Sequence, residues 1–256
     1  MTRLSPERAG RRTEMRNYKI ILAYDGTEFC GWQRQPSVRT VQGELEAVLS
    51  RITQEKVAVM AAGRTDAGVH ARAQAAHFRS DTVLPREELL RAANSLLPRD
   101  IRILALARVP DSFHALRSAR SKVYEYRIWN SPRISPFLIR YVLYWPYELD
   151  IPRMEEAARL FEREADFSAF SSNRLLHPVR KILRSRIRKR GAQIIYAVEA
   201  NGFLRYMVRT IVGTLIEVGR GKIPPSQIEE IFRKNDRSLA GNTAPPEGLS
   251  LVRVKY

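Results

Sequence analysis

The stretch Gly63-Arg64-Thr65-Asp66-Ala67-Gly68-Val69-His70 places a single acid between two glycines and separates two strand-like segments, residues 57–60 and 75–78. Glycine lets a loop turn tightly and approach a ligand closely, so the short side chain of Asp66 projects at a fixed angle. We therefore take Asp66 as the candidate catalytic residue. The alternative is structural, because an aspartate in such a turn usually bonds its own backbone.

Before and after this loop, the pattern predicts one α+β unit. Residues 18–25 alternate as a strand, and Thr40 is placed to cap a helix. A helix over residues 85–97 and a strand over residues 101–109 complete the unit. The inward faces of the first strand and first helix are formed by Tyr18, Ile20, Leu22, Tyr24, Val41, Leu45, Val48, Leu49 and Ile52.

A second unit of the same kind follows. Residues 122–129 have the pattern of a strand with Tyr124, Tyr126 and Ile128 on one face, and another strand is predicted near residues 141–145. Asp150 caps a helix. The inward side of that helix carries Met154, Ala157, Leu160 and Phe161.

The rest of the second unit is predicted from turn and cap signals. Residues 182–188 and 194–199 form a hairpin across Gly191. We then expect an amphipathic helix over residues 202–219, a capping box of Ser226 and Glu229, and a closing strand over residues 249–256.

Together these elements predict an α+β fold. We expect two similar ferredoxin/RRM-like halves that share one continuous, mostly antiparallel sheet, with helices on one face and the active-site cleft on the other. Residues 1–16 are assigned to a disordered basic tail and residues 17–110 to an N-terminal half that carries the Asp66 loop. Residues 111–256 form a C-terminal half that binds the ligand and completes the active site.

Charge identifies the class of partner. Lys and Arg number 44 against 27 Asp and Glu, a net charge of +17, so a polyanion is the natural partner because binding it releases counterions. Nucleic acid is favoured over an anionic membrane, because the chain has no long apolar run and residues 1–17 lack the apolar core of a signal peptide. We expect a soluble, cytoplasmic protein without a membrane partner.

The numbers and spacing of cysteine and histidine indicate whether the chain could form a disulfide or hold a structural metal ion. Cys30 is the only cysteine, which excludes an intramolecular disulfide and a thiolate zinc cage. The four histidines, His70, His77, His114 and His177, lack metal-ligand spacing. We expect no structural metal, while a substrate-bound Mg²⁺ stays open.

Two features have both a binding and a structural interpretation. Seven basic residues crowd into one hairpin strand, where they either contact phosphates or form a solvated face. Phe29, Trp32 and Tyr124 either stack on unpaired bases or belong to the core. The basic residues of that strand are Arg180, Lys181, Arg184, Arg186, Arg188, Lys189 and Arg190.

From Tyr18 to Tyr256 the chain resembles the TruA-like tRNA pseudouridine synthases, through five motifs in order. The Asp66 loop, continued by Ala71, is the catalytic motif of that family without departure. Departures elsewhere are slight: a basic tail precedes the first strand, the chain ends soon after the last motif, and Cys30 stands where an aromatic is common. The other motifs are Tyr24-Asp25-Gly26-Thr27 with Gly31-Trp32-Gln33-Arg34-Gln35 and Thr40-Val41-Gln42-Gly43; Phe113-His114-Ala115 with Tyr124-Glu125-Tyr126; Met207-Val208-Arg209-Thr210-Ile211-Val212-Gly213; and Ala244-Pro245-Pro246-Glu247-Gly248-Leu249.

The resemblance implies isomerisation of uridine to pseudouridine at positions 38, 39 and 40 of the tRNA anticodon stem-loop, without a cofactor. It implies Asp66 as nucleophile, attacking either the ribose or the pyrimidine ring, and Arg209 as the cation that pairs with it. Arg64 acts in base flipping or phosphate contact, Tyr124 stacks on the flipped base and Leu249 forms an apolar wall. His70 is at most a residue that shapes the site. From the charge of the strand, and not from the resemblance, we expect Arg184, Arg186 and Arg188 to bind RNA.

Two other function classes are open to a basic protein of this kind. A non-catalytic RNA-binding or RNA-folding protein on the same scaffold would not need the intact Asp66 and Arg209. A hydrolytic nucleic-acid enzyme would normally need clustered carboxylates for metal ions, and the sequence shows no such cluster. The resemblance also implies a homodimer that takes tRNA across both subunits.

Overall fold

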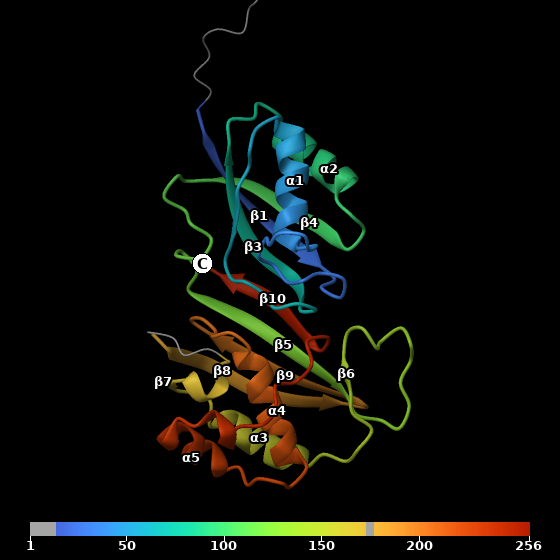
Figure 1. Cartoon of the computed structure of the whole chain (residues 1–256), viewed down its shortest axis with the longest axis vertical. Coiled ribbons are helices and arrows are strands. Elements are labelled where there is room, and N and C mark those ends of the chain that lie inside the picture. Colours follow the sequence, from blue (N-terminus) through green and yellow to red (C-terminus); the bar gives the residue numbers. More distant parts are fainter. Residues whose placement is uncertain (1–13, 173–176) are drawn as a thin grey trace, which may run out of the picture.

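Strand β3 (His70–Ser80) joins the two halves of the molecule in the computed structural model, which describes residues 14–172 and 177–256 (Figure 1). One end of β3 pairs antiparallel with β2 (Val59–Ala61), and the other end pairs parallel with β10 (Leu249–Lys255). Because β2 is only three residues long, the chain leaves the sheet before Gly63. The segment from Gly63 to Val69 therefore becomes a loop at the junction of the two halves.

The N-terminal half has the ferredoxin-like arrangement that the sequence predicts. Its elements run β1 (Arg16–Tyr24), α1 (Val41–Thr53), β2, β3, α2 (Arg86–Leu96) and β4 (Ile101–Val109). The strand order is β4-β1-β3, with β2 on β3, and each of these pairs is antiparallel. Thr40 caps α1 by accepting a hydrogen bond from the backbone N–H of Gly43, as predicted.

The C-terminal half repeats this order. Strand β10, the last in sequence, pairs with β5 (Ser121–Trp129), β5 with β9 (Gln193–Ala200), and β9 with β8 (Val179–Arg190). The half also contains α3 (Ile151–Arg159), α4 (Met207–Gly219) and α5 (Gln227–Lys234). Shorter pieces are β6 (Leu143–Tyr144), β7 (Glu164–Asp166) and two 3₁₀ turns, Ser168–Phe170 and Arg237–Leu239. The α+β class, the similar halves and the shared sheet are thus confirmed.

The helices cover the two ends of the sheet and leave its middle open on the same face (Figure 1). Helices α1 and α2 pack with strands of the N-terminal half, whereas α3 packs on β8, α4 packs on α3 and contacts β5, and α5 lies at the outer end of this second group. The cleft described below contains side chains from α1 and α4. It therefore opens on the helix-bearing face, between the two helix groups, which corrects the expected cleft on the opposite face.

Two predicted helix starts differ from the structure. Helix α4 begins at Met207, five residues after Gly202, because Tyr206 has a left-handed backbone with φ of 62° that breaks the helical run. Ser226 precedes α5 but makes no capping hydrogen bond, since its own backbone is helical. Glu229 instead forms an ion pair with Arg163, so the capping box is not present.

The N-terminal strand begins at Arg16, two residues before the predicted start. Of the predicted tail, residues 1–13 lie outside the described residues. The division into domains at residues 110 and 111 stays a prediction. None of the described helices is long and apolar enough to span a membrane.

Candidate functional site

A cleft of about 1130 Å³ lies over the middle of the sheet, where the two halves meet. One wall is the loop from Gly63 to Val69, the floor includes β5, and the opposite wall is the segment from Phe203 to Arg209. The five residues predicted for catalysis and substrate binding all line it: Asp66, Arg209, Arg64, Tyr124 and Leu249. The fold therefore brings together residues from both halves of the sequence.

The Asp66 loop is held on several sides. The Thr65 hydroxyl shares a buried 2.8 Å hydrogen bond with the Tyr24 hydroxyl, and the Gln74 amide donates to the Gly63 carbonyl at 2.8 Å. Gly68 has a φ of 77°, and a Cβ there would lie 2.8 Å from Pro246. The glycine is therefore required both by its backbone and by the close approach of the segment before β10.

Asp66 and Arg209 face each other across the cleft. The Arg209 Nη1 atom lies 3.6 Å from Asp66 Oδ2, and the side chains are 14% exposed for Arg209 and 25% exposed for Asp66. The guanidinium Nε donates to the Ala244 carbonyl at 2.7 Å. Because one edge of the guanidinium is fixed on Ala244, its approach to Asp66 is one-pronged, unlike the two-pronged pairing typical of buried Arg–carboxylate pairs.

The ionisation of Asp66 reflects two opposed effects. Burial raises the pKa of its carboxyl above the ordinary value, while the positive charges of Arg209 and Arg205 pull the pKa down. Burial is the larger effect, so the pairing arginine offsets the desolvation only in part. The net result is that the pKa of the Asp66 carboxyl lies above its ordinary value.

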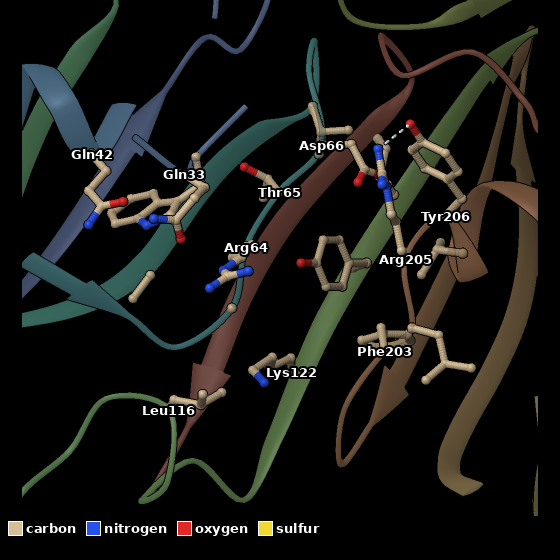
Figure 2. A pocket seen from close by; sticks show the side chains of 18 of the residues that line it. Gln33, Gln42, Arg64, Thr65, Asp66, Leu116, Lys122, Phe203, Arg205 and Tyr206 are labelled. Atoms are coloured by element: carbon tan, nitrogen blue, oxygen red, sulfur yellow. Dashed lines mark hydrogen bonds between the residues drawn. The ribbon is translucent and has the colours of Figure 1, made fainter. Parts of the chain in front are cut away.

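Arg205 and Tyr206 belong to the site although the sequence pattern does not single them out. Two guanidiniums contact the ring of Tyr206, with the Cζ atoms of Arg205 and Arg209 each 4.9 Å from its centroid. Arg205 also donates to the Tyr206 hydroxyl at 3.2 Å, the dashed line in Figure 2. The one feature of the sequence that could have indicated Arg205 and Tyr206 is their position just before the Arg209 motif. The residue pattern there predicts a helix and gives no reason to place them in the cleft.

Tyr124 forms part of the cleft floor. Its ring meets Phe203 edge-on at 5.0 Å, and burial raises the pKa of its hydroxyl, so the group stays protonated. Leu249, at the start of β10, is buried and also lines the cleft. Of the other candidate stacking residues, Phe29 and Trp32 are buried in the core, and Arg39 covers the Phe29 ring at 4.2 Å.

His70 does not line this cleft. It begins β3, where its Nδ1 accepts from the Gly26 N–H at 2.9 Å and its Nε2 lies 2.9 Å from the Arg140 carbonyl. His70 is therefore a buried residue with a partner at each ring nitrogen, and it can affect the cleft only through the Asp66 loop that precedes it. In the described part of the chain, no group of three or more His, Cys, Asp or Glu side chains is placed to hold a metal ion.

The basic strand β8 lies apart from the cleft lining. Arg184, Arg186 and Arg188 are all exposed, and none of them lines the cleft. Arg186 is engaged by Glu162, which follows α3. The structure thus leaves Arg184 and Arg188 the more available of the three for a polyanion.

Sequence comparisons show which known proteins the chain resembles. Residues 20–116 and 157–256 match the profile of a family described as tRNA pseudouridine synthase. The chain is 44% identical to a tRNA pseudouridine synthase A of Anoxybacillus flavithermus over 245 residues, which cover 94% of this chain and 99% of the relative. It is 41% identical to a protein of that name from Thermodesulfovibrio yellowstonii over 254 residues, covering 94% of this chain and 100% of the relative.

Proposed function

This chain belongs to the tRNA pseudouridine synthase family, and on that premise we propose that it modifies uridines 38, 39 and 40 of the tRNA anticodon stem-loop with Asp66 as nucleophile. The chain is an isomerase that makes pseudouridine in tRNA. What the proposal adds is the position of the target uridines and the role of each residue.

The reaction sets clear demands. The N1–C1′ glycosidic bond breaks, the uracil turns, and a C5–C1′ bond forms, while C5 loses a proton and N1 gains one. Uridine and pseudouridine contain the same atoms, so no oxidant, reductant or group donor is consumed. The enzyme needs a nucleophile that adds and later leaves, in a site that keeps the detached uracil.

Asp66 meets these demands because it is the one carboxylate in the described cleft lining and faces Arg209 at 3.6 Å. This pair is the observation that carries the proposal. Attack on the ribose and attack on the pyrimidine ring both require the ionised Asp66 carboxylate, which the Arg209 charge favours. Tyr124 supplies an aromatic face for the flipped base, and Leu249 closes the apolar side.

The target base is buried in a duplex stem or a stacked loop, so it must be flipped into the cleft. Arg64 is exposed at the cleft wall and forms no hydrogen bond or ion pair within residues 14–172 and 177–256. It is free to fill the space that the uridine leaves or to contact the adjoining phosphate.

The proposal includes a homodimer that takes tRNA across both subunits. The segment between β5 and α3 exposes large apolar side chains, among them Phe137, Ile139 and Tyr147, and Phe137 is 87% exposed. Exposed apolar groups gathered in one segment are typical of a protein interface. Light scattering on the purified chain measures whether one copy or two is present.

The test is a map of modified positions. Bulk tRNA from a strain lacking this activity is incubated with the purified chain, and pseudouridines are located by sequencing. Tritium release from tRNA labelled at uridine C5 gives the rate. Modification at positions 38, 39 and 40 is expected; tritium release with pseudouridine elsewhere would overturn the site assignment, and binding without tritium release would indicate a non-catalytic protein.

A further inference from the structure

Positively charged side chains outnumber negatively charged ones in the cleft lining. Among the described lining residues, five side chains are cations and one is an acid. Asp66 faces Arg209 and also interacts with the charge of Arg205, so the acid of the lining already has two cationic partners. The cations without an acidic partner in the lining are Arg64, Arg117 and Lys122.

Lys122 stands out among these because it is buried. It is only 7% exposed, on β5, where it pairs with Ala200 of β9 and Val254 of β10. Within the described residues its ammonium forms no hydrogen bond and no ion pair. It is also two positions from Tyr124 on the same strand, so both side chains point to the cleft face.

The neighbours of Lys122 make room for it without neutralising it. A Cβ added at Gly63 would lie 3.4 Å from the Lys122 Cε, an ordinary van der Waals contact, so the start of the Asp66 loop lies directly against this side chain. Figure 2 shows Lys122 at the end of the cleft with Arg64 and Leu116, and Asp66 with Arg205 toward the other end. Arg180 of β8 adds another positive charge nearby.

The Lys122 side chain is largely buried and its ammonium has no bonded acceptor among the described residues, so burial disfavours the charged form. A structural role would pair it with a carboxylate or carbonyl, and among residues 14–172 and 177–256 none is bonded to it. An anion that enters the cleft from outside the chain would favour the charged form of Lys122. In a tRNA substrate the available anions are phosphodiesters, which lysine binds as a point charge.

We propose that Lys122, with Arg64 and Arg117 beside it, forms a phosphate-binding site that holds a phosphodiester next to the flipped uridine. The proposal deepens the function proposed above and depends on tRNA entering this cleft. Residues two apart on a strand are about 7 Å apart. That separation suits a base on Tyr124 and the phosphate of the same or adjoining nucleotide on Lys122.

Binding is measured apart from chemistry in the Asp66→Asn background, where tRNA is not turned over. There, Lys122→Met is expected to weaken the affinity for an unmodified tRNA transcript by about tenfold to a hundredfold, the effect of removing one charge-assisted hydrogen bond. Lys234→Met, which removes an exposed charge from α5, is the matched control and is expected to change affinity less than about threefold. Equal effects of the two substitutions would overturn the proposal.

The phosphate itself is tested by neutral linkages. Single methylphosphonates are placed at each linkage flanking the target uridine, and the affinity of each RNA is measured for the protein with Lys122 intact and for the Lys122→Met variant. One linkage is expected at which Lys122→Met causes no further weakening, because the neutral linkage has already removed the charge that Lys122 binds. If the weakening stays the same for every linkage, Lys122 contacts the base or ribose and the phosphate site is wrong.

Thermal unfolding and the pH dependence of binding distinguish phosphate binding by Lys122 from a purely structural role. Lys122→Met is expected to leave the thermal midpoint unchanged or raise it, since a buried charge is removed; a lowered midpoint would indicate a packing role. Burial, then the Arg180 charge, lowers the pKa of the Lys122 ammonium, so wild-type affinity should fall with rising pH sooner than for an ordinary lysine. Lys122→Arg should flatten that fall. The charge that acts on Lys122 is that of Arg180, and the other charged or titratable groups that share the cleft face with it are Arg64, Asp66, His114, Arg117 and Tyr124.

These outcomes are separable from those of the proposed function. If the wild-type chain makes no pseudouridine yet the methylphosphonate pattern is found, the phosphate site holds and the reaction assignment fails. If pseudouridine forms at the expected positions but no linkage cancels the effect of Lys122→Met, only the phosphate site fails.

Discussion

The two ends of the cleft carry similar cations in different settings. At one end, Arg209 is fixed on the Ala244 carbonyl and faces Asp66, while Arg205 and Tyr206 close the wall. At the other end, Lys122 is buried without an anion, and Arg64 is exposed without one, among the residues that the structure describes. Both ends lie over the same pair of strands, β10 and β5, in one continuous sheet.

This difference separates chemistry from binding. A paired arginine adjusts the ionisation of a protein carboxylate, whereas an unpaired lysine is available to the charge of a ligand. The β8 arginines form a separate basic surface, because they are exposed, do not line the cleft and pair with the β9 positions that alternate with those opposite Tyr124 and Tyr126. Substitutions at the two kinds of site should therefore affect rate and affinity in different proportions.

The largest effect is expected from Asp66→Asn. The substitution keeps size and polarity but removes the nucleophilic charge, so single-turnover pseudouridine formation should fall by about 10³-fold or more. Affinity for tRNA should stay within about threefold, because Asp66 contributes no attraction to phosphate. Retention of a few per cent of the wild-type rate, after mass spectrometry has excluded deamidation, would contradict the role of Asp66.

A smaller effect, on affinity alone, is expected from the basic strand. Neutralising Arg184, Arg186 and Arg188 together should weaken tRNA binding and reduce the slope of log affinity against log salt by about 0.9 for each duplex phosphate that the protein no longer neutralises. Arg186 should contribute least, since Glu162 already engages it. The matched control neutralises Lys222, Arg233 and Lys234, which are paired with acids on the helical side. An unchanged slope would make the strand a solvated face only.

Strands and helix caps that depend only on neighbouring residues are predicted correctly from the sequence. Strand β4 and the cap of α1 follow from alternation and from a polar residue before an apolar stripe. Motif resemblance places Asp66, Arg64, Arg209, Tyr124 and Leu249 in one site, and the structure brings them together.

What the sequence does not predict depends on contacts between distant segments. The left-handed backbone of Tyr206 and the pairing of Glu229 with Arg163, 66 residues away, leave no local signal. The face on which the cleft opens follows from the β3–β10 pairing and from helices that cover only the ends of the sheet. Strand alternation is enough to place Lys122 beside Tyr124, but its lack of a partner among the described residues is visible only in three dimensions.

The most direct measurement compares single-turnover rate against pH for the wild type, Arg209→Met and Arg209→Lys on one tRNA. Burial already raises the pKa of Asp66, and removing the Arg209 charge should raise it further. The ionised form then appears only at higher pH, so the acidic limb of the Met variant should shift upward while its rate falls. The Lys variant keeps the charge but loses the hydrogen bond to Ala244, so its limb should stay near wild type at a reduced rate. Superimposable acidic limbs for wild type and Arg209→Met would contradict the account, because Arg209 would then not govern the ionisation of Asp66.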